Sequence, residues 1–295
     1  MKPPPFDYYD PTRLADALPL LAEHGRDIKV LAGGQSLLQL LNYRLIRPHA
    51  LLDINRVAEL HLLEQDAEGL RVGATVRQSE LEKFPGLAEI NPLLAEALPW
   101  IGHFQTRNRG TVCGSLAHAD PAAELPAVAL TLEARLTLER TGGRRVVAAR
   151  KFFKEALTTV IEADELMTCV AFPAWNYGDG WAIEQVARRP QDFALVGVAA
   201  LITPADGACA RARLTVFGTG YPPARSEAAE SLLNGKAWSA SLVDEAVACV
   251  RRETRARSDA HATSEYRRYV AGTLAGRALV RAAQRAGLMR EGCHG

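Results

Sequence analysis

The stretch Thr106–Glu124 constrains this chain more than any other. It opens with a basic run that includes Gly110 and then reaches the small residues Cys113-Gly114-Ser115. Asp120-Pro121 follows and predicts an N-cap with proline at the first helical position, continued by a short helix over Ala122–Leu132. A turn of small residues lets a ligand approach the backbone, and free N–H groups there and at a helix start attract an anion such as phosphate. A tight turn before a capped helix, without any ligand, fits this stretch equally well.

A second stretch, Val30–Leu41, has the layout of a phosphate cradle. An apolar strand runs into the pair Gly33-Gly34, and a leucine-rich helix follows. The pattern is neither the dinucleotide fingerprint nor a Walker A sequence, because no lysine follows the glycines. One glycine pair is a weak signal, but two small-residue anion sites in one chain favour a ligand with two phosphates.

Taken together, these stretches resemble a known family. Ala32–Ser36 and Arg107–Glu124 are similar to segments of the FAD-binding medium subunits of the molybdenum hydroxylases. That family includes carbon monoxide dehydrogenase, xanthine dehydrogenase and bacterial dehydrogenases of N-heteroaromatic compounds. The resemblance extends to Gln191–Val196 and Tyr266–Gly272, so it covers essentially the whole chain.

The resemblance implies an α+β fold with two parts. Residues 1–176 would form a FAD-binding domain of the vanillyl-alcohol-oxidase-like type, with subdomains of about 1–55 and 56–176. Residues 177–295 would form a C-terminal domain with a three-stranded antiparallel sheet and a helical bundle. The residues themselves favour a boundary in the loop 173–180, since it begins with Pro173 and contains Gly178 and Gly180.

Local patterns predict several elements. Asp10 and Pro11 predict the start of a first helix, and Gly25 its end. Thr141-Gly-Gly143 predicts the turn of a hairpin. Strands are expected near 28–32, 50–54, 70–76, 165–172, 181–187, 193–202 and 210–218, and helices near 36–44, 78–83, 92–101, 226–233, 241–255 and 264–287.

Composition excludes several classes of protein. The chain has 295 residues, with 35 basic against 34 acidic side chains, so nothing indicates a nucleic-acid surface. No apolar run reaches the length of a membrane span, and the N-terminus has no apolar signal core, so we expect a cytoplasmic protein. The five cysteines are scattered without a ligand-spaced pair, which predicts reduced thiols and neither a metal site nor an iron–sulfur cluster.

The resemblance also implies which residues bind FAD. Gly33, Gly34, Gln35 and Ser36 would hold the pyrophosphate from one side, and Thr111, Gly114 and Ser115 from the other. Glu124 would accept hydrogen bonds from hydroxyls of the cofactor, or else be only a first-turn charge favoured by the helix dipole. Further residues assigned to the cofactor site are Leu31, Ala32, Leu37, Ile101, His118, Asp120, Leu166, Asp192 and Phe193.

Two residues in the central stretch have alternative roles. His118 and Asp120 lie two positions apart, but we expect His118 to pack or to bond the flavin edge and Asp120 to be a cap, with no catalytic residue in this chain. Cys113 stands where the family usually has glycine. It either fits as a small residue or projects toward the cofactor as a reactive thiol.

The function implied by the resemblance is that of an FAD-carrying electron-transfer subunit. Its partners would be a small subunit with two [2Fe–2S] clusters and a large molybdopterin subunit, assembled as a dimer of heterotrimers. Electrons would pass from the clusters through FAD to an external acceptor. The alternative is a module that binds no FAD, such as a phosphoanion-binding assembly factor. Neither the hydroxylated substrate nor the final acceptor can be read from the residues.

Overall fold

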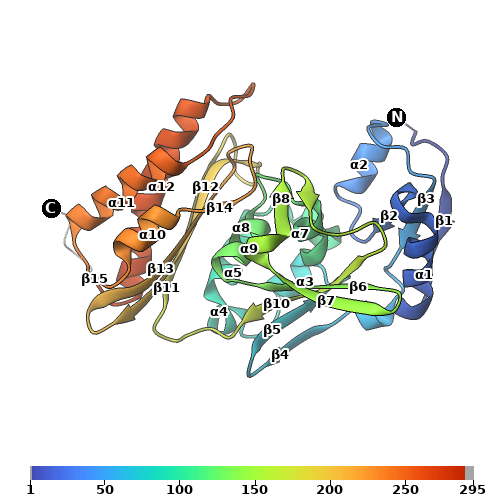
Figure 1. The fold of residues 1–295 in the computed structure, drawn as a ribbon, viewed down its shortest axis with the longest axis horizontal. Helices are drawn as coiled ribbons and strands as arrows, with labels where there is room; N and C mark the ends of the chain where they lie inside the picture. The colour runs from blue at the N-terminus through green and yellow to red at the C-terminus, as the bar shows by residue number, and fades with distance from the viewer. Residues whose placement is uncertain (1, 290–295) are drawn as a thin grey trace.

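The computed structural model describes residues 2–289 and shows an elongated molecule with three main sheets along its length (Figure 1). The first sheet is small, parallel and ordered β1-β3-β2. It lies at the N-terminal end, with α1 between β1 and β2 in the chain and α2 after β2. Its elements are β1 (Asp7–Tyr9), α1 (Leu14–His24), β2 (Ile28–Leu31), α2 (Leu37–Asn42) and β3 (Ala50–Asp53).

The first helix begins later than its sequence predicts. Arg13 is the residue before α1 and has an extended backbone, so Asp10 does not cap the helix. The Asp10 carboxylate instead accepts a hydrogen bond from Arg56 Nη1 at 2.6 Å. The predicted end is confirmed, because Gly25 has a positive φ of 54° and its N–H donates to the Leu21 carbonyl.

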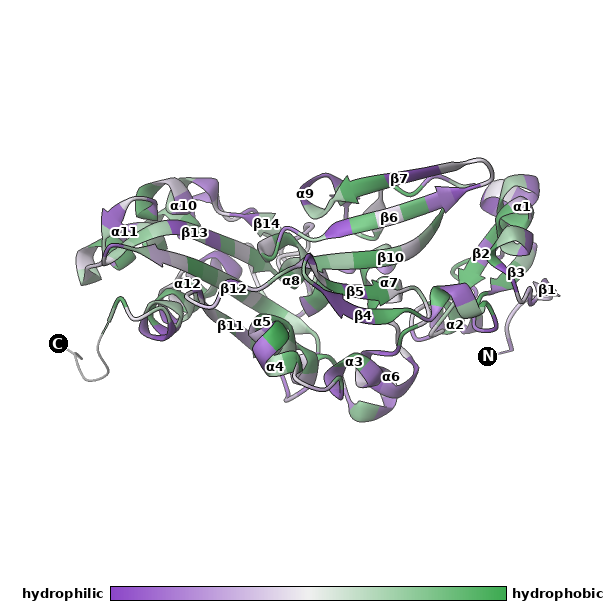
Figure 2. Ribbon diagram, turned by 90° about the horizontal axis from the view of Figure 1, so that it is seen from below, coloured by the Kyte–Doolittle hydropathy of each residue, from purple (hydrophilic) through white to green (hydrophobic). Residues whose placement is uncertain are grey.

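The second sheet forms the middle of the molecule in the order β4-β5-β10-β6-β7. The predicted hairpin is confirmed, since β6 and β7 pair antiparallel on either side of residues 141–142. The central strand β10 is hydrophobic along its length (Figure 2) and belongs to the larger of two cores. The strands are β4 (Leu63–Asp66), β5 (Gly69–Gly73), β6 (Arg135–Arg140), β7 (Gly143–Ala148) and β10 (Leu166–Pro173), with a separate small pair β8 (Phe153–Glu155) and β9 (Thr158–Thr159).

Short helices connect these strands and pack around the sheet. They are α3 (Gln78–Glu82), α4 (Leu87–Ile90), α5 (Pro92–Ala97), α6 (Phe104–Arg109), α7 (Val112–His118), α8 (Glu124–Thr131) and α9 (Ala149–Phe152), with single 3-10 turns at Gly25–Asp27, Ala58–Leu60 and Leu98–Trp100.

The expected turn at Cys113-Gly114-Ser115 is wrong, because these residues lie inside α7. Thr111 is the N-cap, and its hydroxyl accepts from the Gly114 N–H at 3.0 Å. Asp120 does not cap the next helix either. Its carboxylate accepts from the N–H of Ala122, two residues on, which closes a turn, and α8 begins only at Glu124.

The third sheet is antiparallel and contains β11 (Gly180–Ala187), β12 (Ala194–Ala205) and β13 (Ala208–Phe217). The three long strands were predicted, but the short strands β14 (Ala224–Arg225) and β15 (Lys236–Ala237) also pair with β13, so the sheet has five strands rather than three. The covering helices are α10 (Glu227–Leu233), α11 (Ala240–Glu253) and α12 (Ser264–Arg285).

Both faces of this third sheet are buried. Along β12, Val198 and Ala200 pack into a core shared with α11 and α12. The intervening Ala199 and Leu201 pack into the larger core, where α5 and α8 contact the sheet. A strand buried on both faces has an almost continuous apolar sequence, which explains the run Ala194–Ile202. No helix within residues 2–289 is long and apolar enough to cross a membrane.

Candidate cofactor-binding site

The two glycine-containing stretches identified in the sequence meet directly in the structure. A Cβ placed on Gly33 would lie 2.5 Å from the Arg109 carbonyl oxygen and 2.8 Å from Gly110 Cα. Side chains do not approach backbone that closely, so only glycine fits at position 33. The segment after β2 and the segment before α7 therefore form one junction, which we call the glycine junction (Gly33, Gly34 and residues 109–111).

A polar bridge fixes the two sides of the glycine junction. Asn55 donates from Nδ2 to the carbonyl of Ala32 at 3.0 Å, and its Oδ1 accepts from Arg77 Nη2 at 2.6 Å. Arg77 Nη1 in turn donates to the Arg109 carbonyl at 2.8 Å. Burial and the charge of Arg109 lower the pKa of Arg77, but an arginine stays protonated. A half-buried cation thus lies beside the backbone of both stretches.

Backbone hydrogen bonds also hold the glycine junction in place. Gln78 N–H donates to the Gly110 carbonyl at 2.9 Å, and Val112 N–H donates to the Val76 carbonyl at 3.2 Å. The segment after β5 thereby runs beside the segment that enters α7. Neither Asn55 nor Arg77 belongs to a motif, so the sequence carried no signal for this bridge.

On the first side of the junction, the chain turns sharply into α2. Gly34 has a positive φ of 72°, which favours glycine, and its carbonyl accepts from Leu38 N–H at 3.1 Å. Ser36 directly precedes α2, and its side chain makes no capping bond to the helix. Leu31, Ala32, Gln35, Ser36 and Leu37 are all half-buried. Backbone N–H groups and one hydroxyl are thus gathered at this turn.

On the second side, α7 carries four of the predicted site residues, which are Thr111 at its cap and Gly114, Ser115 and His118 within it. Ser115 and His118 are half-buried. Cys113 points elsewhere, since its Sγ lies 3.5 Å from the Val72 carbonyl and its side chain is buried in the core. Burial raises the pKa of this thiol well above its usual value. Of the two roles considered for Cys113, the structure agrees with that of a small buried residue and not with that of a reactive thiol directed at the cofactor.

Glu124 is a buried carboxyl group, only 5% exposed, at the first position of α8. Burial is the main cause that raises its pKa to about 7, and the nearby charge of Asp120 adds to it. Its own backbone N–H and the amide of Gln185 act in the opposite direction. No cation is among the groups that act on this carboxylate in the described chain.

Gln185, on β11, is a further candidate site residue that the sequence did not reveal. Both of its amide atoms are buried, and the amide lies close enough to Glu124 to lower the pKa of that carboxyl, but neither atom reaches hydrogen-bond geometry with a partner within the part of the chain that the structure describes. Buried amides are almost always paired, so this amide has capacity left to bind a polar ligand. Glu124 and Gln185 thus offer paired acceptor and donor groups suited to hydroxyls or to the polar edge of a ring.

The remaining predicted residues come from other elements. Ile101 is half-buried in the turn before α6, and its carbonyl accepts from Arg107 Nη1 at 3.1 Å. Leu166 is buried at the start of β10. Asp192 and Phe193 lie in the turn between β11 and β12, where Phe193 is 66% exposed. None of these four belongs to the glycine junction.

The residues present fit a dinucleotide cofactor such as FAD. The junction supplies a backbone cradle that a side chain would fill, and Arg77 places a positive charge beside it. The orphaned amide of Gln185 and the buried Glu124 supply polar groups for hydroxyls. Among the described residues, no group of three His, Cys, Asp or Glu side chains is arranged to hold a metal ion.

Comparison with known proteins gives a consistent result. Residues 4–175 match the family model described as the FAD binding domain in molybdopterin dehydrogenase, and residues 181–282 match the CO dehydrogenase flavoprotein C-terminal domain. The chain is 38% identical to the 6-hydroxypseudooxynicotine dehydrogenase complex subunit alpha of Paenarthrobacter nicotinovorans, over 97% of each chain. It is also 38% identical to the caffeine dehydrogenase subunit beta of a Pseudomonas species, over 97% of each chain. Its structure is similar to a chain of carbon monoxide dehydrogenase from Hydrogenophaga pseudoflava, with a TM-score of 0.94, 35% identity, and 97% of this chain and 99% of that chain covered.

Proposed function

The chain belongs to the family of FAD-binding medium subunits of molybdenum hydroxylases of the carbon monoxide dehydrogenase type, and we propose that it passes electrons from iron–sulfur clusters through FAD to an external acceptor. It is thus an FAD-carrying subunit of an oxidoreductase. The observation that supports the cofactor's place most directly is the glycine junction, where two separate stretches meet too closely for any side chain.

The proposed partners are a small subunit with two [2Fe–2S] clusters and a large molybdopterin subunit, in a dimer of heterotrimers in the cytoplasm. This chain offers no cluster ligands and no metal site among its described residues, so the oxidation of substrate is assigned to another subunit. The relative from Paenarthrobacter nicotinovorans is likewise described as one subunit of a dehydrogenase complex.

Within the chain, the glycine junction is proposed to hold the pyrophosphate. Backbone N–H groups of Gly33 and Gly34, with Gln35, Ser36 and Leu37, form one wall, and Leu31 and Ala32 lead into it. Thr111, Gly114 and Ser115 form the other wall. Arg77 neutralises part of the phosphate charge from behind the junction. Because the hydrogen bonds of Asn55 and Arg77 restrict the backbone on both sides, the cradle is already formed before the cofactor binds.

Glu124 and Gln185 are proposed to bind hydroxyls or the polar edge of the cofactor. Ile101, Leu166 and Phe193 supply apolar surface, while His118, Asp120 and Asp192 line the polar side. FAD, when bound, accepts and releases electrons, while the protein positions it and sets its surroundings. His118 and Asp120 form no hydrogen bond to one another in the described chain, and the Asp120 carboxylate already bonds Ala122, so no catalytic pair is proposed.

We also propose a division into two domains, residues 1–176 and 177–295, with subdomains of about 1–55 and 56–176 in the first. The loop between β10 and β11 supports this boundary, because the chain passes there from the second sheet to the third. The separate parallel and antiparallel sheets support the subdivision of the first domain. The flavin site would then lie between the two subdomains, as in the vanillyl-alcohol-oxidase-like type.

Purification of the chain alone and with its co-expressed partners tests this function. The expected protein is yellow, with flavin absorption in a stoichiometric amount, and it oxidises no N-heterocycle or aldehyde on its own. The assembled complex should do so. A colourless chain that also resists added FAD would support the assembly module instead, and isolated turnover equal to that of the complex would contradict the division of labour.

A further inference from the structure

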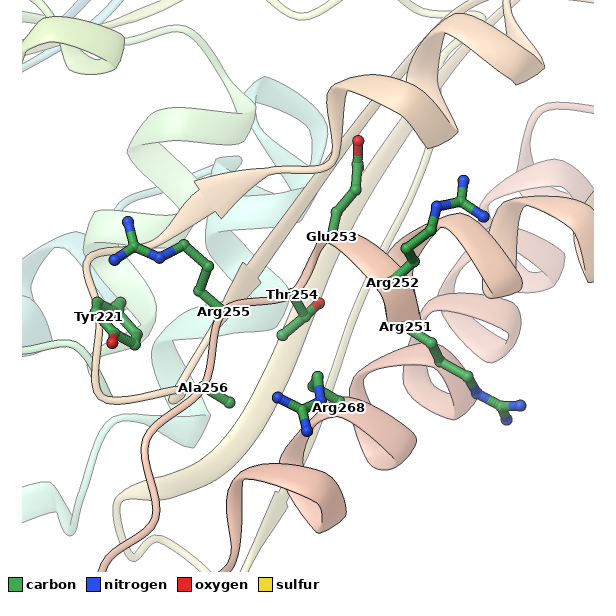
Figure 3. A pocket seen from close by; sticks show the side chains of 8 residues that line it. All are labelled: Tyr221, Arg251, Arg252, Glu253, Thr254, Arg255, Ala256 and Arg268. Atoms are coloured by element: carbon green, nitrogen blue, oxygen red, sulfur yellow. The ribbon is translucent and has the colours of Figure 1, made fainter.

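A cluster of unpaired arginines lies where α11 ends and α12 begins. The cluster, which we call the arginine surface, comprises five arginines, and four of them line an open hollow of about 500 Å³ beside Tyr221 (Figure 3). Its members are Arg251, Arg252, Arg255, Arg257 and Arg268. The whole chain has a net charge of only +1, so this accumulation of positive charge is local.

None of the five guanidinium groups has a carboxylate partner within 4 Å among residues 2–289, whereas Arg107, Arg145 and Arg225 elsewhere form close ion pairs. Of the acidic side chains nearby, Glu253 and Asp259 are already engaged, while Glu265, in the first turn of α12, is exposed and forms no ion pair within the described chain. Glu253 also lines the hollow, and its carboxylate accepts from Ser226 Oγ at 2.6 Å and from Ala228 N–H at 3.2 Å. Asp259 pairs with Arg267 at 2.5 Å.

Aromatic rings hold three of the five arginines in place. Arg255 and Arg257 each lie 4.5 Å from the centre of the Tyr221 ring, and Arg251 lies 4.6 Å from that of Tyr269. Guanidinium–ring contacts hold long side chains in place, so less rotamer freedom is lost when a ligand binds. In Figure 3, Arg255 lies on the side of Tyr221, Arg251 and Arg252 extend to the opposite side, and Arg268 lies between them.

The surface has the composition of a protein interface. Tyr266 and Tyr269, on α12, are 45% and 62% exposed beside these arginines. Arginine and tyrosine are the residue types enriched where proteins bind one another. The hollow is open and the charge continues beyond it, which suits an extended acidic surface better than a small enclosed anion.

The surface also lies next to the loops of the candidate cofactor site. Arg257 N–H donates to the Thr219 carbonyl at 2.9 Å, and the adjacent Gly218 N–H donates to the carbonyl of Pro121 at 2.7 Å. On the other side, His261 lies 3.2 Å from Arg188, in the turn that carries Asp192 and Phe193. A protein bound here would therefore lie beside the segments that lead to Glu124.

We propose that the arginine surface docks a protein partner through a carboxylate-rich patch of that partner. Complementary charge steers the encounter and fixes its orientation, which gives rapid and salt-sensitive association. The proposal goes beyond the electron-transfer role, because it requires only the folded chain and not FAD.

Binding of a short, fluorescein-labelled poly-L-glutamate peptide to the full chain tests the proposal by fluorescence anisotropy. Affinity should fall steeply with added salt, and R255E/R268E should weaken it by roughly tenfold or more. The control R47E/R135E makes the same charge change at two other exposed arginines and should leave affinity nearly unchanged. Equal loss in both variants, or no binding by the wild type, would overturn the proposal. FAD content, measured in parallel, reports on the proposed function separately.

Two further measurements, neither of which needs a variant, distinguish an acidic protein partner from a phosphate ligand and from a second copy of this chain. Inorganic pyrophosphate should displace the peptide only weakly, and tighter binding of pyrophosphate than of peptide would overturn the proposal in favour of a phosphate site. Bound peptide should protect Arg255 and Arg268 from phenylglyoxal while Arg47 and Arg135 stay reactive, as read by mass spectrometry. If the arginine surface is protected from phenylglyoxal without peptide, and dilution removes this protection, the occupant is a second copy of this chain. That result would also overturn the proposal.

Discussion

Arg77 donates from Nη2 to Asn55 Oδ1 at 2.6 Å, and this contact links the two stretches that the sequence identified separately. Asn55 holds the carbonyl of Ala32, and Arg77 holds that of Arg109. The distance between the stretches is therefore set by side chains from outside both of them. A site for a diphosphate needs such a fixed spacing, because its two walls must bind one ligand at once.

Asn55→Ala should weaken FAD binding without unfolding the chain. It removes three side-chain hydrogen bonds, which join Asn55 to the Ala32 carbonyl, the Asp53 carboxylate and the Arg77 guanidinium, and it leaves Arg77 with a single partner in the bridge. The expected loss is about 1–3 kcal/mol, roughly tenfold or more in affinity. Titration of apo-chain with FAD measures it. Asn176→Ala is the matched control, since Asn176 bonds only Asp179 in the loop before β11, and an equal loss there would remove the bridge from the site.

Gly33→Ala should abolish FAD binding more completely than Gly34→Ala. The new Cβ of Gly33 would meet backbone of residues 109–110, which cannot move aside without opening the junction. At Gly34 it would meet the Leu38 side chain at 3.0 Å, which can rotate, so that variant carries mainly the strain of its positive φ, about 1–2 kcal/mol. Gly178→Ala, where the nearest atom is 4.0 Å away, should behave as wild type.

We predict that retained FAD increases in the order Gly33→Ala, Gly34→Ala, Gly178→Ala. The flavin that stays bound after gel filtration measures it. A melting curve of each apo-variant shows whether the fold survives. Stoichiometric FAD in Gly33→Ala would contradict the assignment of the junction to the pyrophosphate.

Thiol reactivity should be confined to Cys249 among the described cysteines. Cys113, Cys169 and Cys209 are buried, and burial raises the pKa of each, so little thiolate is present. Cys249 is half-buried near the surface. In a Cys293→Ser background, which removes the cysteine outside the described residues, a native-state thiol reagent should label Cys249 first. Early labelling of Cys113, identified by peptide mapping, would restore the idea of a reactive thiol beside the cofactor.

The sequence predicted elements where a single local signal decides. The hairpin through Thr141-Gly-Gly143 and the helix end at Gly25 are of this kind, because the turn chemistry lies in the residues themselves. It misplaced the starts of α1 and α8, where an aspartate that could cap a helix has another partner in the folded chain. The Asp10 carboxylate pairs with Arg56, and the Asp120 carboxylate closes a turn with Ala122.

The Asn55–Arg77 bridge and the buried Gln185 amide could not be predicted from the sequence, for a different reason. Arg77 and Asn55 are 22 residues apart, and Arg77 and Arg109 are 32 apart, so only the folded chain brings them together. Gln185 has no distinguishing neighbours in sequence, and its significance lies in the hydrogen bonds that it lacks. By contrast, the family resemblance predicted the FAD-binding family itself, which the comparisons confirm.

Glu124 should make both stability and FAD affinity depend on pH. Its pKa is about 7 in the folded chain against 4.5 for an ordinary glutamate, so the folded state holds this proton more tightly than the unfolded state. Stability of the apo-chain should therefore fall as pH rises from 4.5 through about 7, with a total cost of roughly 3 kcal/mol above that range. Glu124→Gln removes the titrating group, so the apo-variant should melt higher than the wild type at about pH 8 and similarly at about pH 5.

FAD binding should show the opposite pH trend if cofactor hydroxyls donate to this carboxylate. The ionised form is then the better acceptor, so binding lowers the pKa and releases a proton, and affinity rises between about pH 6 and pH 8. A charge-assisted bond exceeds a neutral one by about 1 kcal/mol, so Glu124→Gln should bind FAD several-fold more weakly at the higher pH and lose the pH dependence. Glu124→Ala should lose more, because the hydroxyls stay unpaired. Titrations of all three apo-chains at both pH values decide the question, and equal dissociation constants throughout would leave Glu124 as a first-turn charge with no part in the site.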